Sequence, residues 1–247
     1  MMTTVTIVTG AASGIGAACA QLLCATGVTV LGVDRVAIGW QAPALHTLCI
    51  DICDPTAPAQ ICDFAHQIAP QIAGFVNAAG IMRVAHPFAV DVAHWDSVMG
   101  VNAKATWFLT SAVLQAMMPW QTGSVVLLAS TAGKTATTVM HPIYNISKAA
   151  VIAMTKTMAH TVAASGIRVN CVCPGVIDTP MQSVVTAALV DETQDAALIW
   201  QQRLARVPVG RSGAVSEVAA VVQFLLSEQA SFVHGQAINV CGGMVMQ

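Results

Sequence analysis

The stretch "VTIVTGAASGIG" (residues 5–16) joins a run of apolar, β-branched residues to a glycine-rich turn. The run predicts a buried strand over 5–10, and Gly10, Gly14 and Gly16 predict a tight turn into a helix that ends at Gly27. An ordinary strand-to-helix turn also uses glycine, so this pattern alone is weak. A strand that enters a helix through spaced glycines is nevertheless typical of the first unit of a doubly wound α/β fold.

The rest of the chain repeats this alternation of strand and helix. Strands that are apolar along their whole length indicate a parallel sheet covered on both faces by helices. We therefore predict an α/β fold: a single doubly wound Rossmann-type domain over residues 1–247, with a parallel sheet flanked by helices on both faces. The expected strands are 5–10, 28–34, 48–51, 74–80, 123–130, 167–175 and 237–243.

The composition limits the classes of partner. Only 9% of the residues are charged and 55% are hydrophobic, which predicts burial of surface in an oligomer. No uninterrupted apolar run reaches the ~18 residues of a membrane span, and no basic residue precedes Arg35, so we expect a cytoplasmic protein without a signal peptide. With a net charge of −2 and no basic patch, nucleic acid is not an expected partner.

The eight cysteines lie mostly in apolar runs and are expected to act as small hydrophobic residues in a reducing compartment. Cys171 and Cys173 are expected on opposite faces of their strand, which argues against a shared metal, and the histidines have no metal-ligand spacing. We therefore expect no metal site.

A carboxylate follows the second predicted strand. Asp34 comes about twenty residues after the glycine-rich turn, where an acidic side chain can accept hydrogen bonds from both ribose hydroxyls of an adenosine. It would repel a 2′-phosphate, whereas the adjacent Arg35 would attract one. Helix N-terminal amides in the turn would face the pyrophosphate. We favour NAD as the cofactor.

The segment "PIYNISKAA" (142–150) contains the single tyrosine of the chain, Tyr144, and one of its four lysines, Lys148. Residues four apart share a helical face. The plain alternative is a solvated lysine beside a packed aromatic side chain. A phenol with a pKa near ~10 becomes a usable acid or base when an ammonium and a cationic nicotinamide favour the phenolate. Ser130, which ends the strand before it, could hydrogen-bond the same substrate oxygen.

With these motifs in order, the chain resembles the short-chain dehydrogenase/reductase family over essentially its whole length. The motifs are "TGAASGIG" (9–16), "NAAG" (77–80), Asn102, Ser130, "YNISK" (144–148) and "PGVIDTPM" (174–181). The resemblance implies that Tyr144 is the general acid/base, Lys148 lowers its pKa and holds the nicotinamide ribose, Ser130 orients the substrate oxygen and Asn102 anchors a proton-relay water. It implies that the cofactor contacts Gly10, Ser13, Gly14, Ile15, Gly16, Asp34, Asp51, Ile52, Asn77, Ala78, Ala79, Gly80, Tyr144, Lys148, Pro174, Gly175, Ile177 and Thr179.

The resemblance also implies a substrate lid over 181–206 and a homotetramer. Two features depart from the family pattern. The spacing from Ser130 to Tyr144 is one residue longer than usual, which affects the loop over 131–143. Cys241 replaces the aspartate of the terminal "VDGG" motif, a change we expect to touch only structure.

Three features are similar to one branch of the family, which uses NAD to oxidise 2,3-dihydro-2,3-dihydroxybenzoate in catechol siderophore biosynthesis. They are the short stretch from Asp34 to Asp51, Arg83 after "NAAG", and "DTPMQ" (178–182). The segment before Tyr144 lacks the arginine of that branch. The expected substrate contacts are Met82, Arg83, Lys134, Met140 and Met181, with Arg83 or Lys134 holding a carboxylate.

Alternative functions remain open at this point. A sugar, polyol or 3-oxoacyl dehydrogenase would share the fold and the catalytic residues. A non-catalytic NAD-binding sensor or scaffold is an alternative from a different functional class. Such a protein would not need the combination of Ser130, Tyr144 and Lys148. His141, directly before "PIY", could line a pocket, but a histidine at the end of a loop is more often a surface group, and we favour that position.

Overall fold

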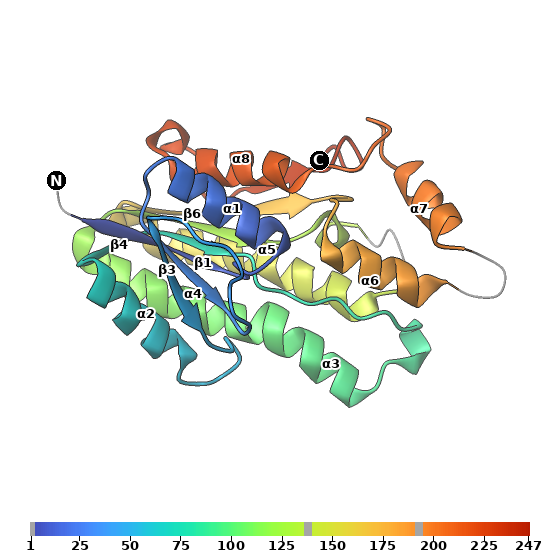
Figure 1. The fold of residues 1–247 in the computed structure, drawn as a ribbon, viewed down its shortest axis with the longest axis horizontal. Helices are drawn as coiled ribbons and strands as arrows, with labels where there is room; N and C mark the ends of the chain where they lie inside the picture. The colour runs from blue at the N-terminus through green and yellow to red at the C-terminus, as the bar shows by residue number, and fades with distance from the viewer. Residues whose placement is uncertain (1–2, 136–139, 191–194) are drawn as a thin grey trace.

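The computed structural model describes residues 3–135, 140–190 and 195–247 (Figure 1). Within them, seven parallel strands form one sheet in the order β3-β2-β1-β4-β5-β6-β7, as predicted for a Rossmann-type domain. The strands are β1 (Thr4–Thr9), β2 (Val30–Asp34), β3 (Leu45–Cys49), β4 (Gln71–Asn77), β5 (Gly123–Leu128), β6 (Ile167–Pro174) and β7 (Ala237–Val240). The α-helices are α1 (Gly14–Ala25), α2 (Ala57–Ile68), α3 (Val92–Met99), α4 (Thr106–Met117), α5 (Pro142–Val162), α6 (Pro180–Leu189), α7 (Ala196–Leu204) and α8 (Val215–Leu226).

The direction of strand order reverses at β1. From β1 the chain builds outward through β2 to β3, then returns to place β4 on the other side of β1. Thr9, the last residue of β1, pairs with Val33 on one side and Asn77 on the other, so the strands end together at one edge. This reversal creates a crevice at the carboxyl edge of the sheet, where ligands bind in folds of this type.

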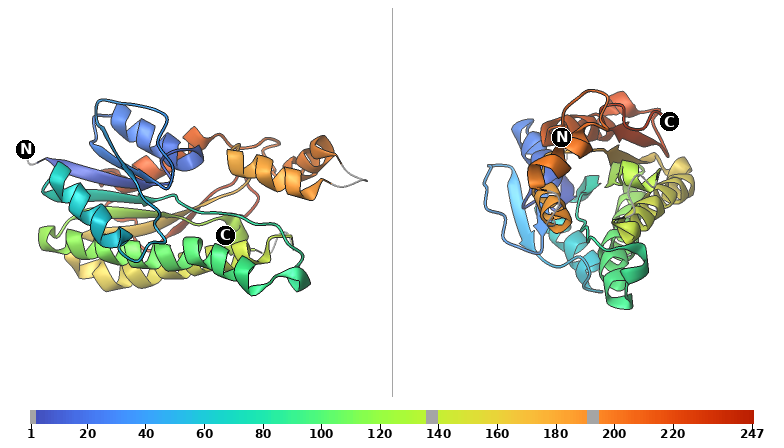
Figure 2. Two further views of the ribbon diagram at one scale, coloured as in Figure 1. Left: turned by 60° about the horizontal axis from the view of Figure 1, so that its bottom comes forward. Right: turned by 90° about the vertical axis from the view of Figure 1, so that its right-hand side faces the viewer.

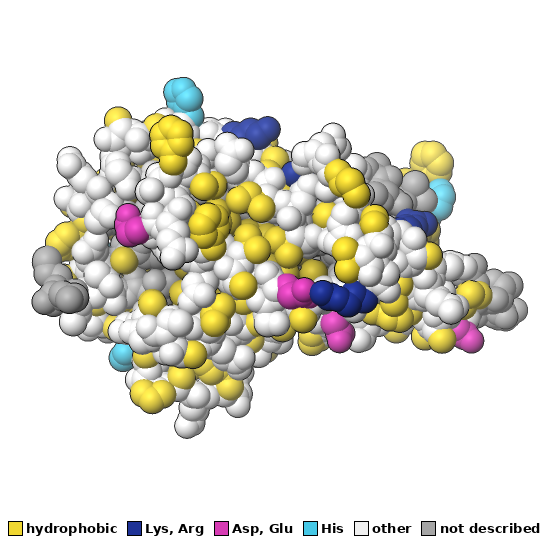
Figure 3. Space-filling model, turned by 90° about the horizontal axis from the view of Figure 1, so that it is seen from above, with side chains coloured by type: hydrophobic (Ala, Val, Ile, Leu, Met, Phe, Trp, Pro, Cys, Tyr) yellow, Lys and Arg dark blue, Asp and Glu magenta, His cyan; other side chains and the backbone are white. Residues whose placement is uncertain are grey.

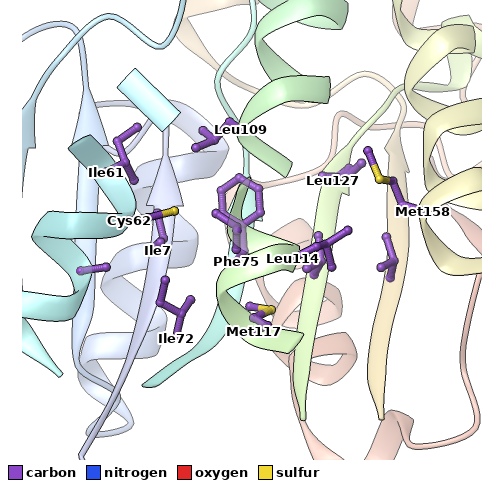
Figure 4. Packing of buried hydrophobic residues seen from close by; sticks show 14 of the residues in the cluster. Ile7, Ile61, Cys62, Ile72, Phe75, Leu109, Leu114, Met117, Leu127 and Met158 are labelled. Atoms are coloured by element: carbon purple, nitrogen blue, oxygen red, sulfur yellow. The ribbon is translucent and has the colours of Figure 1, made fainter. Parts of the chain in front are cut away.

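Two helical layers enclose the sheet (Figures 1 and 2). Because successive strand residues point to opposite faces, Ile7 packs with the helices α2, α4 and α5, and Val8 packs with α1 and α8. Phe75 is fully buried in the first layer, beside Met117 of α4 (Figure 4). Helices α6 and α7 contact each other beyond the carboxyl edge of the sheet.

The third strand begins earlier than predicted, at Leu45 rather than near position 48. As an edge strand it pairs only with β2, and its side chains are exposed or half-buried. It therefore lacks the continuous apolar run that marks the central strands, which is why its sequence pattern was misleading.

The prediction for Cys171 and Cys173 was wrong. Residues two apart on a strand point to the same face, and both thiols are buried in the same core cluster. A hydrogen bond between the two thiols lowers the pKa of Cys171 and raises that of Cys173. Among the described residues, no group of three or more histidine, cysteine or acidic side chains is arranged to hold a metal ion.

Within the described parts of the chain, no helix has the length and apolar character needed to cross a membrane.

Candidate active site

Two adjoining cavities open at the carboxyl edge of the sheet. The first, of about 490 Å³, lies over the turn between β1 and α1 and the end of β2. The second, of about 460 Å³, lies between α5 and the helices α6 and α7. Ile15, Gly80 and Thr179 line both cavities. A ligand that fills the first cavity would therefore reach the second.

The glycine-rich turn needs glycine for two physical reasons. Gly10 and Gly14 have φ values of +68° and +56°, which favour a residue without a side chain. A Cβ atom on Gly16 would lie 2.2 Å from the carbonyl oxygen of Gly10, so helix α1 could not approach β1 so closely. The first turn of α1 lines the cavity, and its free N–H groups suit a pyrophosphate.

The end of β2 is tied to this turn by Asp34. Its Oδ2 atom accepts a hydrogen bond from the N–H of Ala12 at 3.0 Å, and Oδ1 accepts one from the N–H of Val36 at 3.3 Å. Trp40 adds a third tie, because its Nε1–H donates to the carbonyl oxygen of Ala11 at 2.9 Å. Asp34 and Arg35 both line the cavity. The side chains present therefore fit a dinucleotide with its adenosine end beside Asp34.

Most residues expected at the cofactor lie along these two cavities, but Asn77 does not. Its Oδ1 accepts a hydrogen bond from the hydroxyl of Thr9 at 2.5 Å, and its Nδ2 donates one to the hydroxyl of Thr106 at 2.8 Å. The polar groups of the Asn77 side chain are therefore engaged by residues of the protein. The first cavity is lined by Gly10, Ser13, Gly14, Ile15, Gly16, Asp34, Asp51, Ile52, Ala78, Ala79, Gly80 and Thr179; Pro174, Gly175 and Ile177 line the second.

Helix α5 presents Tyr144 and Lys148 to the second cavity. The Nζ atom of Lys148 donates to the carbonyl oxygen of Leu128 at 2.6 Å and lies 5.7 Å from the centre of the Tyr144 ring. Ser130 follows β5, and its hydroxyl accepts from the N–H of Ala132 at 3.1 Å. All three side chains line one wall, so the predicted trio meets in space.

Burial controls the ionisation of this pair in the protein alone. Burial raises the pKa of Tyr144 to about 12, although a hydrogen bond with Ser130 acts in the opposite direction. Burial also lowers the pKa of Lys148 to about 8. The expected net lowering of the phenol pKa is thus not found in the protein alone, because desolvation disfavours both charged forms.

Asn102 connects the segment after β4 to helix α5. It lies in a π-helical segment, η2 (Gly100–Ala105), of the irregular kind often found at functional sites. Its Nδ2 donates to Ser147 at 3.0 Å and to the carbonyl oxygen of Ile81 at 2.8 Å, and its Oδ1 accepts from the N–H of Ile81. A Cβ atom on Gly80 would lie 3.2 Å from Asn102 Oδ1 and 3.4 Å from Lys148 Nζ. The absence of a side chain at Gly80 therefore lets Asn102 and Lys148 lie close to the backbone that follows β4.

Three of the five predicted substrate contacts line the second cavity: Met82, Met140 and Met181. The two basic candidates do not. Arg83 is exposed to solvent, and Lys134 donates through Nζ to the carbonyl oxygens of Ala237 and Gln247 at 2.8 and 3.2 Å. Lys134, which was predicted to bind a substrate carboxylate, is therefore hydrogen-bonded to the C-terminal segment instead.

Sequence reasoning missed polar side chains that line this cavity, among them Gln182, Gln202, Arg203 and Arg206, and it favoured a surface position for His141. His141 is buried rather than on the surface, packs edge-on against the Tyr144 ring at 5.7 Å, and has its Nδ1 atom 2.9 Å from Asn145 Oδ1. Burial is the main reason its pKa is lowered. The available signal was the pair of arginines at 203 and 206, in a chain with only ten basic residues.

The expected lid over 181–206 covers most of α6 and all of α7, and both helices contribute to the cavity wall. Residues 191–194 of this segment lie outside the described residues. The same holds for 136–139, within the longer loop expected between Ser130 and Tyr144.

Comparison with known proteins agrees with this geometry. A family profile described as "Enoyl-(Acyl carrier protein) reductase" matches residues 10–245. The chain is 35% identical to a 3-oxoacyl-(acyl-carrier-protein) reductase of Thermotoga maritima, with 98% of each chain covered. It is 33% identical to the protein of that name from Escherichia coli K12, covering 98% of this chain and 97% of the relative.

Among solved structures, aldohexose dehydrogenase of Thermoplasma acidophilum in its ligand-free form superposes with a TM-score of 0.90. The two chains are 28% identical, and the match covers 98% of this chain and 94% of the other. The fold therefore agrees with that of the solved relative, and the similarity to the relatives extends over nearly the whole chain. The chain belongs to the short-chain dehydrogenase/reductase family, whose members are nicotinamide-dependent oxidoreductases acting on secondary alcohol or ketone groups of small molecules.

Proposed function

We propose that this enzyme uses NAD to interconvert a secondary alcohol and a ketone on a 3-hydroxyacyl or 3-oxoacyl compound. The observation that carries the proposal is the position of Ser130, Tyr144 and Lys148, on the wall of a cavity that adjoins the glycine-rich cofactor cleft. The names of the relatives favour a 3-oxoacyl substrate over 2,3-dihydro-2,3-dihydroxybenzoate. The exposed Arg83 and the engaged Lys134 also weaken the siderophore expectation.

The side chains of the cavity divide the work between them. A bound nicotinamide supplies or accepts the hydride. Tyr144 donates its phenolic proton to the carbonyl oxygen during reduction and accepts the hydroxyl proton during oxidation. Ser130, which is hydrogen-bonded to the phenol, holds the same substrate oxygen. Lys148 lies behind the ring, where its ammonium favours the phenolate at the moment of proton transfer.

Asp34 supports NAD rather than NADP. Its carboxylate lies in the wall of the cofactor cavity and is fixed there by two backbone N–H groups. A 2′-phosphate beside it would meet like charge in a partly desolvated site. Arg35 lines the same cavity and acts in the opposite direction, so the ratio of kcat/KM values for NAD and NADP is the direct measure.

The test of this function is a turnover screen with NAD or NADH. Acetoacetyl and 3-hydroxybutyryl thioesters, the corresponding free acids, glucose, neutral polyols and the dihydrodiol acid are compared by NADH absorbance, with Tyr144→Phe protein as the blank. Turnover of the 3-oxoacyl or 3-hydroxyacyl compounds supports the proposal. Turnover confined to sugars or polyols would contradict the proposed 3-oxoacyl substrate class and keep the oxidoreductase function. Absence of turnover with every alcohol and ketone tested would contradict the oxidoreductase function itself.

A further inference from the structure

Arg203 of α7 has an unused hydrogen-bonding group at the substrate cavity. Its Nη2 atom donates to Gln182 Oε1 of α6, whereas its Nη1 atom is buried and has no hydrogen-bond partner among the described residues. Both side chains line the cavity that holds Tyr144. A buried guanidinium nitrogen without a partner is unfavourable, because water has been removed and nothing in the protein replaces it.

No acidic side chain among the described residues that line the cavity balances the charge of Arg203. Lys148 and Arg206 line the same cavity. Burial lowers the pKa of Arg203, and repulsion from Arg206 lowers it further. A guanidinium nevertheless remains protonated at neutral pH. An anion that enters the cavity would therefore meet a partly desolvated cation with a free N–H donor.

This donor lies near the reacting groups. Arg203, His141 and Tyr144 all line this cavity, and the positive charge of Arg203 contributes to the lowered pKa of His141. The His141 ring packs edge-on against Tyr144, with 5.7 Å between ring centres. An anion at Arg203 would thus share one cavity with His141 and Tyr144.

We infer that the substrate carries a free carboxylate close to its hydroxyl or keto carbon, and that Arg203 Nη1 binds this carboxylate while Gln182 holds the guanidinium in place. The inference rests on the proposed function and narrows it to short hydroxy acids and oxo acids rather than thioesters. A phosphate is the other anion with this chemistry. Because Nη2 is already engaged by Gln182, the arrangement suits a carboxylate oxygen more than a phosphate, which commonly uses both arms of the guanidinium fork.

Binding can be measured without turnover in Tyr144→Phe protein saturated with NAD. Calorimetry compares 3-hydroxybutyrate with 3-hydroxybutyramide, benzoate with benzamide, and inorganic phosphate. For at least one pair we expect the acid to bind more tightly by about tenfold or more, the effect of one charge-assisted hydrogen bond. Adding Arg203→Met or Arg203→Gln should remove the preference. Arg211→Met is the matched control, because Arg211 is exposed and pairs with Glu217 at 2.8 Å.

Each result decides for or against the carboxylate site. Equal binding of acid and amide in both pairs, or an acid preference that survives in both correctly folded Arg203 variants, would overturn it. So would a loss of equal size in Arg211→Met. Phosphate binding that is tighter than either acid and lost in the Arg203 variants would replace the carboxylate by a phosphate. Failure of the proposed function is separate, since it is seen as absence of wild-type turnover.

Discussion

Tyr144 and Lys148 are both removed from water, and burial shifts their pKa values in opposite directions, to about 12 and about 8. Each shift favours the neutral form of its group. With only Lys148 beside it the phenol is therefore neutral at neutral pH, and further positive charge in the cavity would favour the phenolate. The single tyrosine of the chain is thus placed where its ionisation depends on what else occupies the cavity.

Replacing the phenol tests this role. We expect Tyr144→Phe to lower kcat by about 10²- to 10⁴-fold, because the proton-transfer group is lost while the ring remains. The Kd for NAD should stay near the wild-type value, since most of the lining of the cofactor cleft is unchanged. NADH absorbance gives the rate and calorimetry the Kd. Turnover close to that of the wild type would exclude Tyr144 as the acid/base.

Lys148 should leave a signature in the pH dependence of stability. Its pKa falls from 10.5 in the unfolded chain to about 8 in the folded protein. Between these pH values the unfolded chain binds more protons, so the contribution of Lys148 to the free energy of unfolding rises with pH. Below about pH 8 this dependence disappears, because both states are protonated.

We therefore expect the stability difference between wild type and Lys148→Met to increase in favour of the wild type from about pH 8 to pH 10. Urea unfolding at a series of pH values measures it. Lys156→Met is the matched control, because Lys156 is exposed on the same helix. A difference that is independent of pH would contradict the burial argument.

At the scale of elements, the junction of β1, α1 and β2 is closed by backbone contacts. Gly16 packs against the carbonyl oxygen of Gly10, and Asp34 and Trp40 hold the peptide groups of Ala11 and Ala12. These contacts come from three separate segments. Their shared result is a rigid turn whose N–H groups face the cofactor cavity.

Gly16→Ala should disturb this junction, because the new methyl group would lie 2.2 Å from the Gly10 carbonyl oxygen. Overpacking of this kind typically removes about 1–3 kcal/mol of folding stability. We also expect the Kd for NAD to rise, because the shifted turn lines the cofactor cavity. Gly39→Ala is the control, since a Cβ atom there meets no atom within 4 Å. Calorimetry on both proteins makes the comparison. Equal affinity in the two variants would show that the turn tolerates the methyl group.

At the end of β2, two adjacent side chains of opposite charge, Asp34 and Arg35, line the cofactor cavity, and we propose that they set the cofactor preference. We expect Asp34→Ala to shift the ratio of kcat/KM values toward NADP, because repulsion of the 2′-phosphate is removed and Arg35 remains. Adding Arg35→Ala should cancel that gain. Steady-state rates with both cofactors provide the measurement. A wild-type enzyme that already prefers NADP would mean that Arg35 dominates.

At the scale of the whole molecule, the surface carries few charges. Figure 3 shows one face on which charged side chains are sparse among hydrophobic ones. Two helices also present large apolar side chains: Trp107 and Phe108 of α4 are 37% and 55% exposed, and Ile146 of α5 is 45% exposed. Exposed apolar side chains of this size are often buried in a protein interface. We propose a homotetramer that buries this surface of α4 and α5 in one interface and α8 with β7 in another.

Light scattering should then give four times the monomer mass of 25.5 kDa at micromolar protein. Phe108→Glu should lower this mass, because a carboxylate would have to be buried in the interface. Thr47→Glu, at an exposed position of the edge strand β3, should leave it unchanged. A monomeric wild type would refute the tetramer, and an unchanged mass in Phe108→Glu would move the interface away from α4.

Local chemistry explains why much of the molecule could be predicted from the sequence. A parallel strand buried on both faces requires an apolar run, and the β1–α1 turn requires glycine at Gly10 and Gly16 whatever surrounds it. Tyr144 and Lys148 share a face because four residues span about one helical turn. Each of these properties depends on neighbours in the chain. The central strands and the shared helical face of Tyr144 and Lys148 therefore followed from the order of residues, whereas the start of the edge strand β3 did not.

The tertiary structure alone decided which polar groups face the substrate. Lys134 is held by the carbonyl oxygen of Ala237, more than a hundred residues away, whereas Arg203 reaches the cavity because α7 packs against α6. His141, at the start of α5, is buried and packs edge-on against the Tyr144 ring. No periodicity records such contacts, since they join segments distant in sequence through packing. The reaction class was therefore readable from local motifs, whereas the charge that selects the substrate depended on how the helices assemble over the sheet.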